Sequence, residues 1–195
     1  MHLDGNVALI TGASRGIGRG IAKVLATQGM RLALNYHREH GAAMETLEAV
    51  QEVGAEAITV RADVSDQGQV TSMVATVLER FGQLDLLVNN AGIDSAHAPE
   101  ELPLAEWERV LAVNLTGAFL CSQAALTPMR TQGRGRIVMI ASIASLRGAG
   151  NVHYVASKAG MLRLTMPLAP GTSTPPPVRG ARSRSKARPA ATRSG

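Results

Sequence analysis

The sequence is poor in cysteine and lacks a long apolar run. Cys121 is its single cysteine, so an intrachain disulfide is excluded and a reducing compartment is the simpler expectation. Within AFLCSQAAL we expect Cys121 to be a small buried side chain. No segment approaches the roughly 18 apolar residues of a membrane span, and the start MHLDGNVALITG has no basic leader. We therefore expect a cytoplasmic protein with no membrane partner.

Acidic residues are missing from residues 170–195, which hold six of the 20 basic residues. This leaves 14 basic against 15 acidic residues in 1–169, so that part is about neutral although the whole chain carries +5. Five of the nine prolines also lie in 170–195. A stretch rich in proline and positive charge, with few apolar residues, cannot bury a core. We predict a folded domain over 1–168 and a disordered Pro/Arg-rich tail over 169–195.

Short apolar runs of strand character alternate with segments of helical period along the first region. The runs lie at 6–13, 31–36, 56–62, 84–91 and 135–142. Apolar strands separated by amphipathic helices imply parallel pairing, with each helix a right-handed crossover. The predicted fold is a doubly wound, Rossmann-like parallel α/β sheet, whose ligands bind beyond the carboxyl ends of the strands.

Two of the intervening segments show one apolar stripe at helical spacing. In QVTSMVATVLERF the stripe consists of Val70, Met73, Val74, Val77, Leu78 and Phe81. In the segment after the first strand it consists of Ile17, Ile21, Val24 and Leu25. We expect these stripes to face the sheet.

The first predicted strand ends in TGASRGIG, with glycines at Gly12, Gly16 and Gly18. Glycine permits a tight turn and lets backbone N–H groups approach a phosphate at a helix N-terminus, where the helix dipole favours negative charge. Three glycines alone are a weak signal, but their position between the first strand and the first helix strengthens it. The turn predicts a dinucleotide site.

Further motifs follow in order: NNAG at 89–92, Asn114 in VNLTGAF, Ser142 after the fifth strand, and Tyr154 with Lys158 as Y-x3-K. With the G-x3-G-x-G spacing of the turn, the chain resembles the short-chain dehydrogenase/reductase family, nearest to 3-oxoacyl-(acyl-carrier-protein) reductase-like members. The resemblance spans residues 11–158. It implies an oxidoreductase that transfers a hydride between a nicotinamide cofactor and a small carbonyl or alcohol substrate, with acyl thioesters among the substrate classes, in a chain that is usually a homotetramer.

The resemblance assigns roles to particular residues. The implied catalytic residues are Asn114, Ser142, Tyr154 and Lys158. The implied cofactor-binding residues are Gly12, Ser14, Arg15, Gly16, Ile17, Gly18, Tyr36, Arg38, Asp63, Val64, Asn90, Ala91 and Gly92, together with Tyr154 and Lys158.

The chemistry of these side chains supports the roles. Tyr154 and Lys158 are four residues apart, and residues at that spacing lie on one face of a helix. Lys158 can therefore place its charge near the Tyr154 hydroxyl and favour the phenolate. A tyrosine of lowered pKa becomes a usable acid and base near neutral pH. Ser142 can hydrogen-bond the substrate oxygen, and the resemblance gives Asn114 a part in a proton relay. Any one of these residues in isolation would more simply be structural.

The residues after the second strand bear on the choice of dinucleotide. NAD binders place an acidic residue there for the ribose 2′-hydroxyl, whereas NADP binders supply arginine for the 2′-phosphate. Here Asn35 and Tyr36 stand where the acid would be, Arg38 follows, and Arg15 lies in the glycine turn. The acidic Glu39 would favour NAD, but we expect its side chain to face solvent. The sequence favours NADP over NAD.

Members of the family continue after the Y-x3-K helix with a sixth strand that ends in Pro-Gly. Here LAPG arrives only twelve residues after Lys158, too soon for the helix to finish and a strand to cross the sheet. We expect a sheet that is incomplete at its C-terminal edge, in a chain truncated or frameshifted after about residue 168. The fifth strand would then be an exposed edge, and the alternative to an enzyme is a non-catalytic chain with at most partial nucleotide binding.

Two other kinds of ligand, nucleic acids and metal ions, have weaker support in the sequence. The basic tail would support salt-dependent nucleic-acid binding, but we expect no specific nucleic-acid partner. His37 and His40 are three residues apart and lack a third ligand, so the sequence predicts no metal site. His153, beside Tyr154, has no assigned role.

Overall fold

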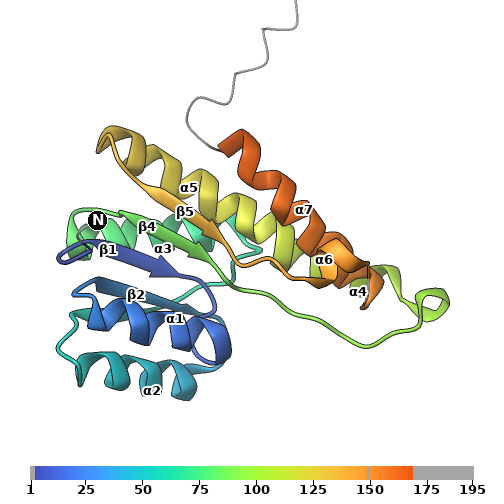
Figure 1. Cartoon of the computed structure of the whole chain (residues 1–195), viewed down its shortest axis with the longest axis horizontal. Coiled ribbons are helices and arrows are strands. Elements are labelled where there is room, and N and C mark those ends of the chain that lie inside the picture. Colours follow the sequence, from blue (N-terminus) through green and yellow to red (C-terminus); the bar gives the residue numbers. More distant parts are fainter. Residues whose placement is uncertain (1–2, 149, 169–195) are drawn as a thin grey trace, which may run out of the picture.

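The computed structural model describes residues 3–148 and 150–168. Within them, five parallel strands form one sheet in the order β3-β2-β1-β4-β5 (Figure 1). The strands are β1 (Val7–Ile10), β2 (Arg31–Tyr36), β3 (Ala57–Arg61), β4 (Leu86–Asn89) and β5 (Arg136–Met139). This confirms the predicted doubly wound, Rossmann-like sheet. The tail predicted for 169–195 lies outside the described residues.

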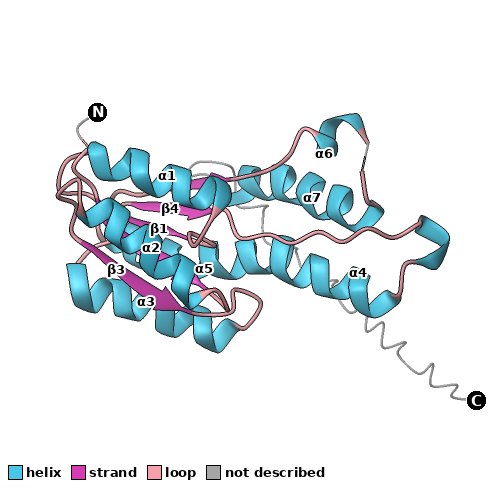
Figure 2. Ribbon diagram, turned by 90° about the horizontal axis from the view of Figure 1, so that it is seen from below, coloured by secondary structure: helices cyan, strands magenta, loops and turns pink. Residues whose placement is uncertain are grey.

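Helices connect the strands on both faces of the sheet. The first three are α1 (Gly16–Thr27), α2 (His40–Gln51) and α3 (Gln67–Phe81). After a 3-10 turn at Pro99–Glu101 come α4 (Leu104–Leu111), a π-helical segment (Ala112–Thr116) and α5 (Gly117–Thr131), which form one continuous helix. The short α6 (Ala144–Arg147) and the long α7 (Val152–Leu168) follow β5. Figure 2 shows α7 running alongside the α4–α5 helix.

Side chains of β1 alternate between two cores, one on each face of the sheet. Val7 and Leu9 belong to the core that includes residues of α3 and α5. Ala8 and Ile10 belong to the core beneath α1. All four are fully buried, and each burial of a Val, Leu or Ile side chain stabilises the fold by about 1.5–3 kcal/mol. Burial on both faces explains why the strand reads as an unbroken apolar run.

The predicted stripe of α3 is confirmed. Five of its members are buried and Leu78 packs against the same core. The helix begins at the N-cap Asp66, whose side chain accepts a hydrogen bond from the Gln69 N–H at 2.9 Å. It ends at Gly82, which has the left-handed conformation common after helices.

The predicted stripe of α1 is wrong in part. Ile21 and Leu25 pack against the core, but the exposed fractions of Ile17 and Val24 are 65% and 62%. The buried residues of α1 are instead the small ones, Gly18, Ala22 and Ala26. Because small side chains let the helix lie close to the sheet, they define its buried face and turn part of the apolar stripe outward.

Two observations concern the second half of the sheet. Among the described residues, one helix, Leu104–Thr131, is long and apolar enough to cross a membrane. Its buried residues, among them Cys121 and Ala125, pack into the core of the sheet, and burial raises the pKa of the Cys121 thiol to about 12. In the described sheet β5 is an edge strand, and Val138 on it is 42% exposed. The predictions for Cys121 and for the edge are confirmed.

Candidate active site

The turn after β1 depends on glycine at two kinds of position. Gly12 and Gly16 adopt positive φ angles of 62° and 57°, which other residues rarely adopt. At Gly18 a side chain has no room, because a Cβ atom would lie 2.4 Å from the Gly12 carbonyl oxygen and 2.6 Å from Asn90 Nδ2. The turn and the end of β4 are therefore in direct contact.

The N-terminus of α1 is open. Its N-cap residue, Arg15, is extended, no side chain caps the first turn, and the first turn carries no acidic residue. The first backbone N–H groups of a helix have no partner within the helix and carry partial positive charge. This arrangement fits an anion such as the pyrophosphate of a dinucleotide.

Two buried residues to which the sequence analysis gave no binding or structural role hold the turn in place. Asn35 Oδ1 accepts from the Gly12 N–H at 3.2 Å, and Asn35 Nδ2 donates to the Ala62 carbonyl at 3.0 Å. Thr11 Oγ1 accepts from the N–H groups of Asn90 and Ala91, at 2.9 and 3.0 Å. The signal for Asn35 was present, since an amide in the buried strand LALNY requires partners.

Asn90 and Arg19 fix the turn from two other sides. Asn90 Nδ2 donates to the carbonyl groups of Thr11 and Gly12, at 2.8 and 3.0 Å. Arg19, on α1, donates twice to the Ser14 carbonyl, at 3.1 and 2.7 Å. These bonds join β1, α1 and the end of β4 into one unit, so the position of the open helix end is set by the sheet.

One pocket of about 660 Å³ runs along the carboxyl ends of the strands. We call its two ends the glycine-turn end, around Gly12 and Tyr36, and the tyrosine end, around Gly92 and Tyr154. Most of the predicted cofactor-binding residues line it: Gly12, Ser14, Arg15, Ile17, Tyr36, Arg38, Asp63, Val64, Asn90, Ala91, Gly92, Tyr154 and Lys158. Gly16 and Gly18 shape the turn without lining the pocket.

Two exposed cations lie at the glycine-turn end, on Arg15 and Arg38. Tyr36 is buried, and its hydroxyl is 2.9 Å from His40 Nδ1. Glu39 is exposed, as predicted, but it also lines the pocket. The last residues of β2, Asn35 and Tyr36, are not acidic, and no described acid is part of that strand end.

Asp63, at the end of β3, is fixed by its neighbours. Its carboxylate accepts from the N–H and the hydroxyl of Ser65, at 2.9 and 2.7 Å. Burial opposes ionisation, but these hydrogen bonds and the nearby His37 outweigh it and lower the pKa of the carboxyl. Asp63 is therefore an oriented acceptor at the wall of the pocket.

At the tyrosine end, α7 places Tyr154 and Lys158 one turn apart. Lys158 is 3% exposed, and its Nζ donates to the Ile140 carbonyl at 2.8 Å. Nζ also lies 5.8 Å from the centroid of the Tyr154 ring. Burial lowers the pKa of the Lys158 ammonium, since the charged form loses its hydration. The lysine is thus held near the tyrosine, as the spacing predicted.

Asn114 belongs to the π-helical segment, a local distortion that is frequent at functional sites. It is fully buried, with its Nδ2 donating to the Ile93 carbonyl at 2.9 Å and to Ser157 Oγ at 3.0 Å. Its Oδ1 accepts from the Ile93 N–H at 2.8 Å. Asn114 therefore joins the loop after β4 to α7, and it lies beside Lys158: a Cβ atom on Gly92 would be 3.3 Å from Lys158 Nζ and 3.4 Å from Asn114 Oδ1.

Ser142 is placed differently from the other predicted catalytic residues. Its Oγ accepts from the Ala144 N–H at 3.2 Å, and its carbonyl accepts from the Ser145 N–H at 3.1 Å, so it lies at the start of α6. It is outside the lining of the pocket. The fold brings Asn114, Tyr154 and Lys158 together, while Ser142 stands at the edge of this group.

A parallel doubly wound sheet with a glycine turn, an open helix N-terminus and a pocket at the strand ends defines a dinucleotide-binding α/β domain. Residues 6–174 match the family model described as short chain dehydrogenase. The chain belongs to the short-chain dehydrogenase family, whose members are oxidoreductases that use a nicotinamide cofactor.

Relatives within this family differ in what their names say they act on. The chain is 40% identical over 168 residues to a 3-oxoacyl-[acyl-carrier-protein] reductase of Synechocystis sp., covering 86% of this chain and 68% of that protein. It is 39% identical over 170 residues to glucose 1-dehydrogenase 2 of Bacillus subtilis, covering 86% of this chain and 66% of that protein. The chain thus spans about two thirds of the length of these relatives.

A solved structure of NAD+-bound xylitol dehydrogenase superposes with a TM-score of 0.82 at 37% identity, covering 86% of this chain and 65% of that one. The chain therefore shares its fold with this structure, in agreement with the match to the family model. The names of the relatives span several substrates, and one of the matching structures holds NAD+.

Proposed function

We propose that this chain is an NADP(H)-dependent oxidoreductase that interconverts a carbonyl and an alcohol, with 3-oxoacyl thioesters as its substrate class. The observation that carries the proposal is one pocket lined by Tyr154 and the buried Lys158 at one end and by the glycine turn at the other. Similarity to a 3-oxoacyl-[acyl-carrier-protein] reductase supports the substrate class. The proposed unit is residues 1–168, with 169–195 as an appended tail.

In this proposal Tyr154 is the acid and base. A nicotinamide cofactor, held by the residues of the glycine turn and by Lys158, would supply the hydride for reduction of the carbonyl carbon or take it up in oxidation. The Tyr154 hydroxyl gives its proton to the carbonyl oxygen, so that an alcohol and a phenolate result, and the reverse holds for oxidation. The Lys158 ammonium, held by the Ile140 carbonyl, stabilises that phenolate.

Asn114 and Ser142 have supporting roles in the proposal. Asn114 holds the Ile93 backbone and Ser157, so it positions Lys158 and the loop after β4 relative to one another. Ser142 would hydrogen-bond the substrate oxygen, which requires its Oγ to exchange its bond with the Ala144 N–H for one to substrate.

The preference for NADP rests on charge at the glycine-turn end. Arg15 and Arg38 are exposed there, and the end of β2 carries Tyr36 in place of an acid. Arginine is the usual partner of the 2′-phosphate, since its planar fork matches phosphate oxygens. Glu39 and Asp63 also line the pocket here, and their carboxylates would repel the same phosphate.

Oxidation of NADPH by the purified full chain with acetoacetyl-coenzyme A tests the proposal. We expect turnover that falls about 10²–10⁴-fold in Tyr154→Phe, because general acid catalysis contributes that much. Lys158→Met should lose turnover as well, while the exposed Lys23→Met is the matched control.

The same samples discriminate the alternative of a nucleotide-binding chain without catalysis. Binding of NADPH, followed by its fluorescence, with no turnover and no difference between the wild type and Tyr154→Phe, would favour that alternative and reject the enzyme. Turnover with a sugar alcohol and NAD+ in place of the thioester would keep the enzyme and reject the proposed substrate and cofactor.

A further inference from the structure

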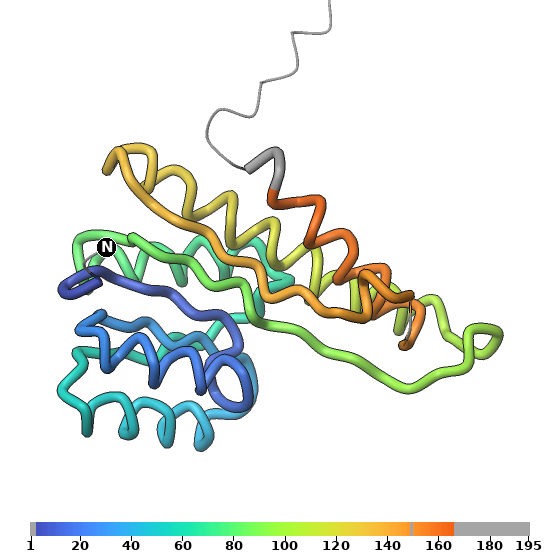
Figure 3. Tube along the Cα trace, in the orientation of Figure 1, coloured from blue at the N-terminus to red at the C-terminus, as the bar shows by residue number. Residues whose placement is uncertain are grey.

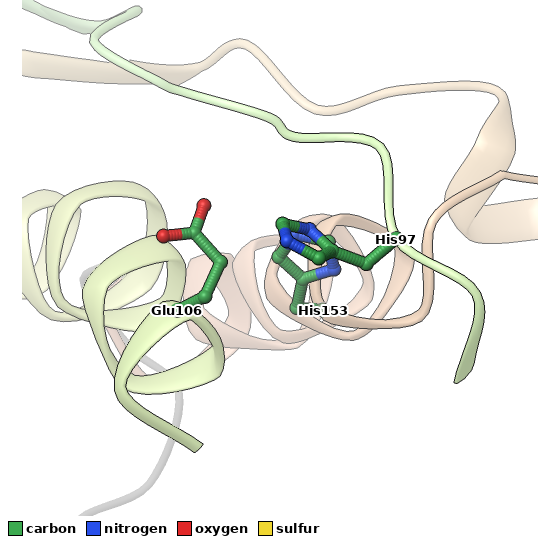
Figure 4. Close-up of side chains that lie close together, drawn as sticks. All are labelled: His97, Glu106 and His153. Atoms are coloured by element: carbon green, nitrogen blue, oxygen red, sulfur yellow. The ribbon is translucent and has the colours of Figure 1, made fainter. Parts of the chain in front are cut away.

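A cluster of potential ligands lies beside the pocket, formed by residues that the proposed function does not use. His97 comes from the loop after β4, Glu106 from α4 and His153 from α7 (Figure 4). One ring nitrogen of each histidine and one carboxylate oxygen all lie within 4.8 Å of one another. Three elements that are distant in sequence thus bring two imidazoles and a carboxylate to one point.

The two histidines have unused hydrogen-bonding capacity. His153 is 1% exposed, its Nε2 is 2.9 Å from Ser95 Oγ, and its Nδ1 has no hydrogen-bond partner among the described residues. The Nδ1 of His97 is also buried without a partner in the described structure. A buried polar atom without a partner costs free energy, about 1–3 kcal/mol. Each ring therefore has one nitrogen that no hydrogen bond among the described residues engages.

Glu106 supplies the negative charge that a cation needs. Its carboxylate accepts hydrogen bonds from Arg109, at 2.8 and 2.6 Å, and from Ser95 Oγ. A metal ion at this carboxylate would have to compete with the Arg109 guanidinium.

We propose that His97, Glu106 and His153 bind a divalent transition-metal ion, Zn²⁺ being the best match to this donor set. Two imidazoles and one carboxylate are a known zinc ligand set, which leaves a fourth position for water or for Ser95 Oγ. Ligand atoms about 2.0–2.2 Å from zinc lie closer together than 4.8 Å, so binding draws the cluster inward.

The position of the cluster suggests what the ion does. Figure 3 shows the loop after β4, residues 90–103, running out from the sheet before it reaches α4. Asp94 in this loop lines the pocket, and its Oδ1 lies 4.0 Å from His153 Nε2. An ion at the cluster would fasten this loop to α4 and α7, and so fix one wall of the pocket next to Tyr154.

Competition with a chromophoric chelator measures Zn²⁺ binding by the metal-free full chain, independently of catalysis. We expect one ion per chain, with affinity reduced at least tenfold in His97→Ala and in Glu106→Gln, since even outer partners of metal ligands contribute 10–100-fold. Glu108→Gln, an exposed acid on the same helix, and His40→Ala are the matched controls and should leave affinity unchanged.

Arg109→Ala tests the direction in which the affinity for Zn²⁺ changes, and a structural defect would not produce the expected direction. Removing the competing guanidinium should raise the affinity for Zn²⁺, whereas loss of a packing partner would lower it or leave it unchanged. With Co²⁺ in place of Zn²⁺, the visible absorption should disappear in His97→Ala. Absence of binding, or binding that both His97→Ala and Glu106→Gln leave intact, overturns the proposal.

Discussion

At its glycine-turn end the pocket presents a backbone turn that buried side chains brace, whereas at its tyrosine end it presents the side chains of Tyr154 and Lys158. The turn after β1 is held by bonds to the carbonyl or N–H groups of Thr11, Gly12 and Ser14, in the middle of the sheet. The tyrosine end depends on Asn114 and Lys158, which reach across from helices beside the edge strand β5. A side chain added at Gly18 therefore meets backbone, whereas a substitution of Asn114 or Lys158 removes side-chain hydrogen bonds.

Gly18→Ala should have the largest effect on stability and binding, because it adds a Cβ atom where the turn contacts the end of β4. Its Cβ atom would meet the Gly12 carbonyl oxygen at 2.4 Å, so we expect a loss of about 3 kcal/mol of stability and loss of NADPH binding. Gly20→Ala in the same helix meets nothing within 4 Å. This control should be neutral or stabilising, by up to about 1 kcal/mol, because alanine favours helix. Urea unfolding of the two variants measures the difference, and equal stabilities would contradict the backbone account.

Asn114→Ala should loosen the tyrosine end while leaving the glycine-turn end intact. The substitution leaves the Ile93 N–H and carbonyl without their side-chain partners, so we expect a loss of about 1–3 kcal/mol. Hydrogen exchange of the amides in residues 90–103 should accelerate, while that of β1 and β2 changes little beyond the global loss. Acceleration spread evenly over the sheet would show that the two ends are one cooperative unit.

Arg38→Ala should weaken the preference for NADPH over NADH by about tenfold, since a charge-assisted hydrogen bond contributes about 1.5–3 kcal/mol. Measured as the ratio of the two dissociation constants, the effect should be absent in Arg130→Ala, which removes an exposed arginine from α5. A preference for NADH in the wild type would contradict the proposal that Arg38 binds the 2′-phosphate of NADP.

Glu106→Gln should change the acid dependence of stability slightly. The pKa of Glu106 is lowered from 4.5 to about 2, so its ionised form stabilises the folded chain above pH 4.5. That contribution is lost as the pH falls from 4.5 towards 2, because the unfolded chain takes up the proton first. Thermal unfolding of the metal-free chain across this interval should be less pH-dependent in the variant, with Glu108→Gln as the control. Identical slopes would show that Arg109 does not hold the carboxylate in solution.

The strands, the α3 stripe and the glycine turn could be predicted from sequence, because each depends on neighbours in the chain. The α1 stripe could not be predicted in full, since its buried face is set by how closely Gly18, Ala22 and Ala26 approach the sheet. The edge position of β5 in the described sheet could be predicted as well, because the sequence contains no sixth strand at the expected distance after Lys158. The assignment of Asn114, Ser142, Tyr154 and Lys158 to catalysis stays a prediction.

By itself, the sequence determined the order of strands and helices, the positions where only glycine fits, and the spacing that places Tyr154 and Lys158 on one helical face. These are properties of local periodicity and of backbone freedom. The tertiary structure alone decided that Asn35 and Thr11 brace the turn and that His97, Glu106 and His153 meet. Such contacts join residues far apart in the chain, and no local pattern encodes the distance between them.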